Sequence, residues 1–148
     1  MSLVRSLAAA LLPLLTAAGV VAADGAALFT QHCATCHQPT AEGTVGLAPS
    51  LKGEHWQRLG AQRPYLATVM LKGLAGPIKV NGQPFSGSMP AFAAQLGDDD
   101  LAAIATHLRG LQGAAADKAY AADEFAPLRA AAGNPSQTRA LRRQILGE

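Results

Sequence analysis

The sequence predicts an all-α domain in which three main helices are joined by long loops. Three segments repeat apolar residues at helical spacing, and no segment shows a convincing alternation of period two. Two long irregular stretches, residues 38–63 and 74–97, hold many of the glycines and prolines. At 148 residues, the chain is expected to form one domain with short appended segments.

The first and third helices have recognisable amino ends. The first is expected over residues 24–33, where Asp24 can cap the helix and Gly25 and Phe29 share one stripe. The third begins at the acidic run 98–100, where carboxylates meet the positive end of the helix dipole. Its apolar face is formed by Leu101, Ile104, Leu108 and Leu111.

The second helix lies between the two irregular stretches. Pro64 falls in its first turn, and Gly73 is well placed to end it. Its apolar face is formed by Leu66, Val69 and Met70. Long loops usually argue against a compact domain, but they fit a chain that wraps a cofactor. Aromatic residues are only 5% of the chain, so a planar cofactor would also supply missing apolar mass.

Residues 1–23 have the pattern of a secretory signal. Arg5 provides the positive region, residues 7–15 the apolar region, and residues 21–23 the small side chains before a cleavage point at Asp24. The alternative is an uncleaved membrane anchor, although the apolar stretch is marginal in length and is interrupted by Pro13, Thr16 and Gly19. We therefore expect an exported, periplasmic protein with no integral membrane span after cleavage.

Charged residues are few and are scattered along the chain. The net charge is +2 without a long run of one sign, which argues against a nucleic-acid-binding protein. From residue 113 to 148 the sequence becomes alanine-rich with scattered charges, and residues 133–136 interrupt it. This tail is either helical or disordered, and three arginines stand near its end: Arg139, Arg142 and Arg143.

The strongest motif is Cys33-Ala34-Thr35-Cys36-His37, which has the C-x-x-C-H pattern of covalent haem attachment. Two thiols one helical turn apart can add to the two vinyl groups of a haem, and the adjacent imidazole then reaches the iron. A thioredoxin-like site would need a βαβ setting, which is missing. A structural zinc site would need a second pair of ligands, and the sequence has none.

Met89 is the expected second axial ligand of the iron. Met1 leaves with the signal, and Met70 lies on the apolar stripe of a helix, where a core role is favoured. Met89 stands in a loop between Gly87, which allows close backbone approach, and Pro90, which stiffens the chain. The competing bis-histidine arrangement would use one of the remaining histidines, His32, His55 or His107.

These motifs resemble a class I (mitochondrial-type) monohaem cytochrome c of the bacterial periplasmic kind, over residues 24–112. The matching pieces stand in family order at residues 25–37, 48–53, 88–92 and 100–109. The resemblance implies a cytochrome c fold, with three main helices and loops wrapped around one haem c attached through two thioethers.

The resemblance also implies roles for individual residues. Pro49 matches the proline whose carbonyl accepts a hydrogen bond from Nδ1 of the proximal histidine, and Leu51 and Phe92 match positions that pack on the haem. Gly25 and Phe29 match the crossing with the third helix, where His107 stands in place of the usual aromatic residue. Trp56 is a candidate donor to a haem propionate, or else a packing residue.

The expected function is one-electron transfer between periplasmic redox partners, such as a dehydrogenase, a reductase or an oxidase, without enzymatic activity of its own. The protein is either a free carrier or the haem subunit of a complex. Peroxide or oxygen chemistry would require Met89 to be absent or displaced, and a sensor would need an output domain larger than residues 113–148. This tail is expected to serve docking or tethering and not haem binding, the alternative being a terminus without a role.

Overall fold

The structure is a computed structural model that describes residues 23–114 and 119–148. The predicted signal, residues 1–23, lies outside the described part except for Ala23. Helices dominate the fold, as predicted, and the three expected ones are α1 (Gly25–His32), α4 (Arg63–Lys72) and α5 (Asp98–Leu111). Within the described ranges, no helix is long and apolar enough to cross a membrane.

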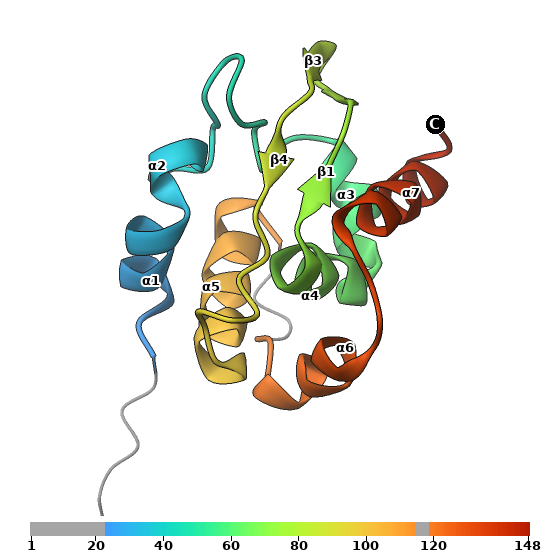
Figure 1. The fold of residues 1–148 in the computed structure, drawn as a ribbon. Coiled ribbons are helices and arrows are strands. Elements are labelled where there is room, and N and C mark those ends of the chain that lie inside the picture. The colour runs from blue at the N-terminus through green and yellow to red at the C-terminus, as the bar shows by residue number, and fades with distance from the viewer. Residues whose placement is uncertain (1–22, 115–118) are drawn as a thin grey trace, which may run out of the picture.

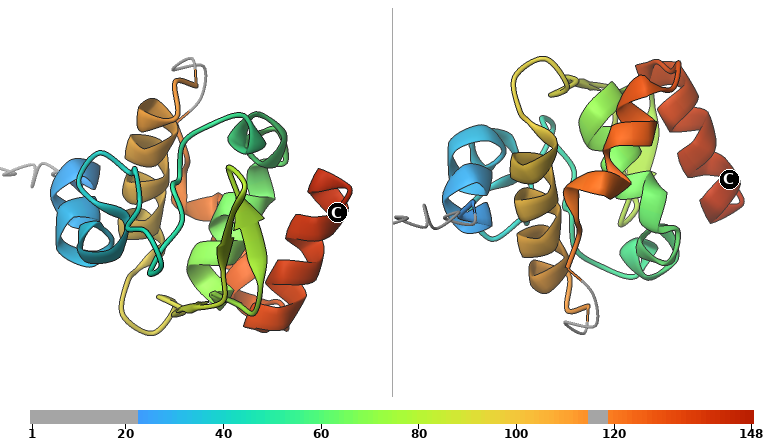
Figure 2. Two further views of the ribbon diagram at one scale, coloured as in Figure 1. Left: turned by 90° about the horizontal axis from the view of Figure 1, so that it is seen from above. Right: turned by 90° about the horizontal axis from the view of Figure 1, so that it is seen from below.

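Helices α1 and α5 cross at close range, side by side in Figures 1 and 2. Asp24 Oδ1 accepts hydrogen bonds from the amides of Ala26 and Ala27, which fixes the start of α1. A Cβ atom added to Gly25 would lie 2.1 Å from the Ala103 carbonyl oxygen, so only glycine permits this approach. Phe29 is buried, and its ring centroid lies 5.5 Å from that of His107. The crossing predicted from the sequence is therefore confirmed, with His107 in it.

Helix α4 forms the centre of the core. It begins with proline in its first turn and ends at Gly73, whose φ of +72° is a conformation that glycine adopts at no steric cost. The predicted face is buried at Leu66, Val69 and Met70. The apolar face of α5 packs into the same core through Leu101, Ile104 and Leu108.

The two stretches predicted as irregular contain more structure than expected. Helix α3 (His55–Ala61) lies inside the first stretch, and the single-turn helix α2 (Ala34–His37) ends just before it. The second stretch folds into two antiparallel pairs of short strands, in which β1 (Leu74–Ala75) pairs with β4 (Ser88–Met89), and β2 (Ile78–Val80) pairs with β3 (Gln83–Phe85). Strands of two or three residues are too short to produce a detectable alternation.

The chain beyond residue 112 returns to the body of the molecule. Its described elements are the 3₁₀ helix η1 (Ala122–Glu124), α6 (Ala126–Ala130) and α7 (Pro135–Leu146). Helix α7 contacts α3, α4 and β1, and it lies along that side of the molecule in Figure 1. Tyr120 and Phe125 are buried in the same hydrophobic core as Phe29. The sequence allowed either a helical or a disordered tail. The described residues include three helical segments, and these are joined to the core by buried side chains such as Phe125.

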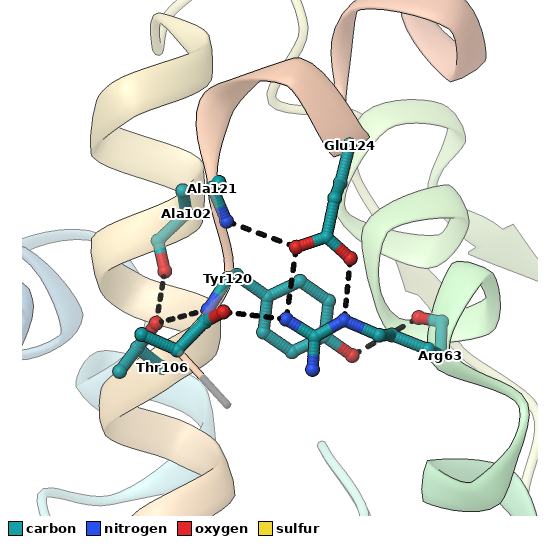
Figure 3. A network of polar contacts seen from close by, with 7 residues as sticks. Arg63, Ala102, Thr106, Tyr120, Ala121 and Glu124 are labelled. Atoms are coloured by element: carbon teal, nitrogen blue, oxygen red, sulfur yellow. Dashed lines mark hydrogen bonds and ion pairs between the residues drawn. The ribbon is translucent and has the colours of Figure 1, made fainter. Parts of the chain in front are cut away.

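A polar network holds the start of this segment against α4 and α5 (Figure 3). Glu124 pairs with Arg63 of α4, and Arg63 also donates to the Ala119 carbonyl at 2.6 Å. The Tyr120 hydroxyl donates to the Arg63 carbonyl at 3.0 Å, while the Tyr120 amide donates to Oγ1 of Thr106 on α5 at 2.8 Å. Backbone and side-chain bonds to two core helices make residues 119–125 part of the domain.

Candidate functional site

An apolar cavity of about 210 Å³ lies between the α1–α2 corner, α3, α4 and the paired strands. All seven residues predicted for the site line it: Cys33, Cys36, His37, Pro49, Leu51, Met89 and Phe92. Most of the remaining wall is aliphatic or aromatic, including Leu66 and Met70 of α4. The fold therefore brings segments separated by more than fifty residues to one cavity.

The two cysteines lie at the corner between α1 and α2. Cys33 ends α1, and its carbonyl accepts the His37 amide at 2.9 Å, which closes the single turn of α2. Both thiols are free; Cys33 is half-buried and Cys36 is exposed. Burial, and secondarily the neighbouring Cys36, raise the pKa of the Cys33 thiol to about 11. The Cys33 thiol is thus protonated at neutral pH, and the two cysteines stand one helical turn apart at the cavity wall.

His37 is held in one orientation by a backbone carbonyl. Its Nδ1 lies 3.0 Å from the carbonyl oxygen of Pro49, and because a carbonyl can only accept, Nδ1 carries the hydrogen. Burial lowers the pKa of this imidazole, partly offset by the Pro49 bond, so the neutral ring is favoured. Nε2 then keeps its lone pair, which is the form that binds a metal.

The loop that carries Pro49 folds back tightly against His37. The Gly43 amide donates to the His37 carbonyl at 2.9 Å, and Gly43 has a φ of +79°. A Cβ atom at this position would lie 2.5 Å from the carbonyl carbon of Pro49. Thr44 Oγ1 adds a bond to the Cys36 carbonyl at 2.9 Å. The position of His37 is therefore set by the tight turn at Gly43 and by the Pro49 carbonyl.

Met89 reaches the cavity from strand β4. It stands opposite Leu74 in the β1–β4 pair, and its carbonyl oxygen would lie 2.5 Å from a Cβ atom at Gly73. Met89 is half-buried, whereas Met70 is enclosed in the core, although both line the cavity. The backbone of Met89 is thus fixed by strand pairing, while its side chain is only partly buried and lines the cavity.

The histidines separate into two groups. His32 and His55 line the cavity, whereas His107 is absent from its described wall and packs against Phe29. A bis-histidine arrangement would therefore have to use His32 or His55. Burial and the nearby Arg142 lower the pKa of His55, while the Ser50 backbone and Glu148 raise it.

One end of the cavity is polar. Trp56 Nε1 is buried there without a hydrogen-bond partner among the described residues. The guanidinium-bearing Arg142 of α7 also lines the wall. Sequence reasoning proposed Trp56 as a donor to a haem propionate or else a packing residue, and His55 as one of three alternative axial ligands. It expected the tail not to take part in haem binding. No local pattern marks Arg142, because its position depends on a contact with residues far away in the chain.

These features fit a haem. The apolar walls suit a planar macrocycle, the two thiols and the oriented imidazole suit its attachment and ligation, and the unpartnered Trp56 N–H suits a carboxylate at the polar end. Within the described ranges, no group of three or more His, Cys, Asp or Glu side chains forms a separate metal site.

Comparison with known proteins identifies the class. Residues 22–112 match the family model for cytochrome c, and the chain belongs to that family. As a member, it carries a covalently attached haem c with its iron, and it is an electron carrier and not an enzyme.

Particular relatives sharpen this assignment. The chain is 38% identical over 129 residues to cytochrome c-552 of Thermus thermophilus, covering 83% of this chain and 97% of that protein. It is 33% identical over 108 residues to the cytochrome c subunit of gluconate 2-dehydrogenase from Pantoea cypripedii, covering 71% of this chain and 24% of that subunit. It is also 30% identical over 86 residues to cytochrome c6 of Microcystis aeruginosa, covering 57% and 90% respectively.

Proposed function

We propose that Cys33 and Cys36 attach the haem, that His37 and Met89 are its axial ligands, and that the protein passes single electrons between periplasmic redox proteins. The observation that carries this proposal is the meeting of these four side chains at one apolar cavity. Attachment is an addition, in which each S–H bond adds across a vinyl group and leaves a thioether without net oxidation.

The haem iron, when bound, supplies the redox chemistry by alternating between ferric and ferrous states. The chain's own contribution is to exclude water and to hold its two ligands still. Pro49 holds His37 at Nδ1, and the β1–β4 pair holds the backbone of Met89. Histidine and methionine together favour a high reduction potential and leave no open coordination position for oxygen or peroxide.

An apolar rim beside the cavity supports electron exchange with other proteins. Val45 and Leu47 are 91% and 57% exposed, and Leu47 also lines the cavity. The loop that bears them projects between α2 and α3 in Figure 1. Exposed apolar side chains beside a cavity can mark a protein contact, and a dehydrogenase, a reductase or an oxidase are the candidate partners. Export by residues 1–23 would place this exchange in the periplasm.

The packing of the C-terminal segment argues against its being a sensor's output domain. An output domain needs a core of its own, whereas Phe125 is buried in the core shared with α1 and α5. The described part of residues 113–148 therefore belongs to the domain that forms the cavity.

The attachment is tested by producing the protein in cells that mature c-type cytochromes. Haem staining should survive a denaturing gel, and acidified organic solvent should leave the haem on the polypeptide. Cys33→Ser with Cys36→Ser should abolish both signals. Haem that extracts freely from the unmodified protein would overturn the proposal.

The ligation is tested by comparing Met89→Ala with Met70→Leu. Met89→Ala should remove the weak sulfur-to-iron charge-transfer band of the ferric protein, lower the potential and allow exogenous ligands to bind. Met70→Leu conserves volume in the core and should keep the band. If Met89→Ala keeps the band, the sulfur ligand is not Met89. His32→Ala and His55→Ala would then test the bis-histidine alternatives.

A further inference from the structure

Pro49, whose carbonyl orients His37, depends on its neighbours in the chain for its own position. Proline has no N–H group, so its backbone can only accept a hydrogen bond, and its carbonyl accepts from His37 Nδ1 at 3.0 Å. The segment is therefore held through the residues on either side of it. On the amino-terminal side, the amide and the carbonyl of Ala48 both bond to the backbone of Thr44, at 2.9 Å each. On the carboxyl-terminal side, the segment is held at Leu51.

Both backbone polar groups of Leu51 are bonded, and one partner comes from a distant part of the chain. The Leu51 amide donates to the carbonyl of Ala41, a fully buried residue of the same loop, at 2.9 Å. The Leu51 carbonyl accepts from Nε2 of Gln112 at 3.0 Å, across a separation of 61 residues. Gln112 stands at the carboxyl end of α5. It therefore joins α5 to the loop that orients His37.

The Gln112 side chain is itself held by Arg109, one turn earlier on α5. Nη1 of Arg109 donates to Oε1 of Gln112 at 2.7 Å. Because a guanidinium can only donate and a carbonyl can only accept, both ends of the amide are used and its orientation is fixed. The guanidinium lies against Gly60 of α3, where a Cβ atom would be 2.0 Å from Nη1. Arg109 and Gln112 thus form a half-buried polar contact between α5, α3 and the loop.

We propose that Gln112 is a positioning residue for His37. By holding the Leu51 carbonyl, it keeps the Pro49 carbonyl on Nδ1 of the imidazole, and this lowers the reduction potential of the haem. The inference rests on the proposed haem site, in which His37 binds the iron. A carbonyl that accepts from Nδ1–H makes the imidazole a more basic ligand. Such a ligand stabilises ferric iron more than ferrous iron, because the ferric ion carries the higher positive charge.

The test compares Gln112→Leu with Gln144→Leu in the haem-loaded protein, since Gln144 is an exposed glutamine of α7. Proton NMR of the ferrous form gives the rate at which the Nδ1 hydrogen of His37 exchanges with water, and this rate reports opening of the Pro49 bond itself. In Gln112→Leu the rate should rise about fivefold, as expected for the loss of one hydrogen bond. The ferrous-to-ferric ratio at a fixed potential should rise about threefold, which is about 28 mV for one electron. If both readings equal those of Gln144→Leu, the inference is wrong.

A second variant separates the Leu51 bond from the Arg109 contact, and it decides the question if Gln112→Leu fails to fold. Gln112→Glu keeps an oxygen for Arg109 but has no N–H to donate at neutral pH. It should speed the exchange of the His37 Nδ1 hydrogen as Gln112→Leu does, and an unchanged rate would overturn the inference. Failure of the proposed haem site is distinguishable, because the unmodified protein would then lack the haem or the ring-current-shifted His37 resonances of an axial ligand.

Discussion

Residues 23–112 and residues 119–148 are held in the same core by different means. In the first region, caps, turns and a short motif set the backbone locally, as at Asp24 and in the Gly43 loop around His37. In the second region, long-range contacts fix the position of the backbone. Arg58, Arg63 and Lys72 of the first region bond to residues of the second. The first region carries the C-x-x-C-H motif, while the second adds Arg142 to the described wall of the cavity. A cofactor motif can therefore be complete while the cavity around it is not.

Truncation after Gly113 is the strongest test of this difference. It would remove two buried aromatic residues of the shared core, Tyr120 and Phe125, together with Arg142. Loss of one buried phenylalanine side chain costs about 3–5 kcal/mol, so we expect the free energy of unfolding to fall by about 5 kcal/mol or more. Guanidinium unfolding followed by haem absorbance measures this. A truncated chain that unfolds at the original midpoint would show that the segment is an accessory.

Arg129→Gln probes a single contact between the regions. The Arg129 side chain pairs with Asp98 and donates to the carbonyls of Ala93 and Leu96, just before α5. We expect a loss of about 3 kcal/mol in the free energy of unfolding, because a half-buried carboxylate and two carbonyls lose a charged donor. The reduction potential should not change, because Arg129 is not on the described cavity wall. Arg143→Gln, on an exposed side chain, is the control and should cost less than about 0.5 kcal/mol.

Gly43→Ala tests the local placement of His37, with Gly82→Ala as its matched control. Both glycines have a φ of +79°, but a Cβ atom would meet backbone within 2.6 Å at Gly43 and nothing within 4 Å at Gly82. The shared backbone strain should cost about 1 kcal/mol in each variant. Gly43→Ala should cost about 2 kcal/mol in total, since the Pro49 loop must move, and it alone should alter the potential. Equal losses in thermal unfolding would show that the loop adapts freely.

The predictable part of the fold is the part whose signals are local. The caps, proline and glycine at the helix ends predicted α1, α4 and α5 nearly to the residue. The hairpin between β2 and β3 was missed, although its turn at Asn81-Gly82 has positive φ at both residues and is a strong hairpin sequence. Helix α3 was missed because its seven residues are too few to repeat an apolar spacing, and Glu54 before it is not a preferred capping residue.

The sequence by itself carries the motif behind the proposed attachment, because Cys33, Cys36 and His37 lie within one turn of chain. It also determined the main helices, whose periodicity and caps act over a few residues. Only the tertiary structure decided that Met89 and Pro49 meet His37 at one cavity, through backbone pairing and a hydrogen bond. Only it decided that Arg142 stands on the cavity wall. Such placements depend on many contacts between residues that are far apart in the chain, and a local sequence pattern does not show these contacts.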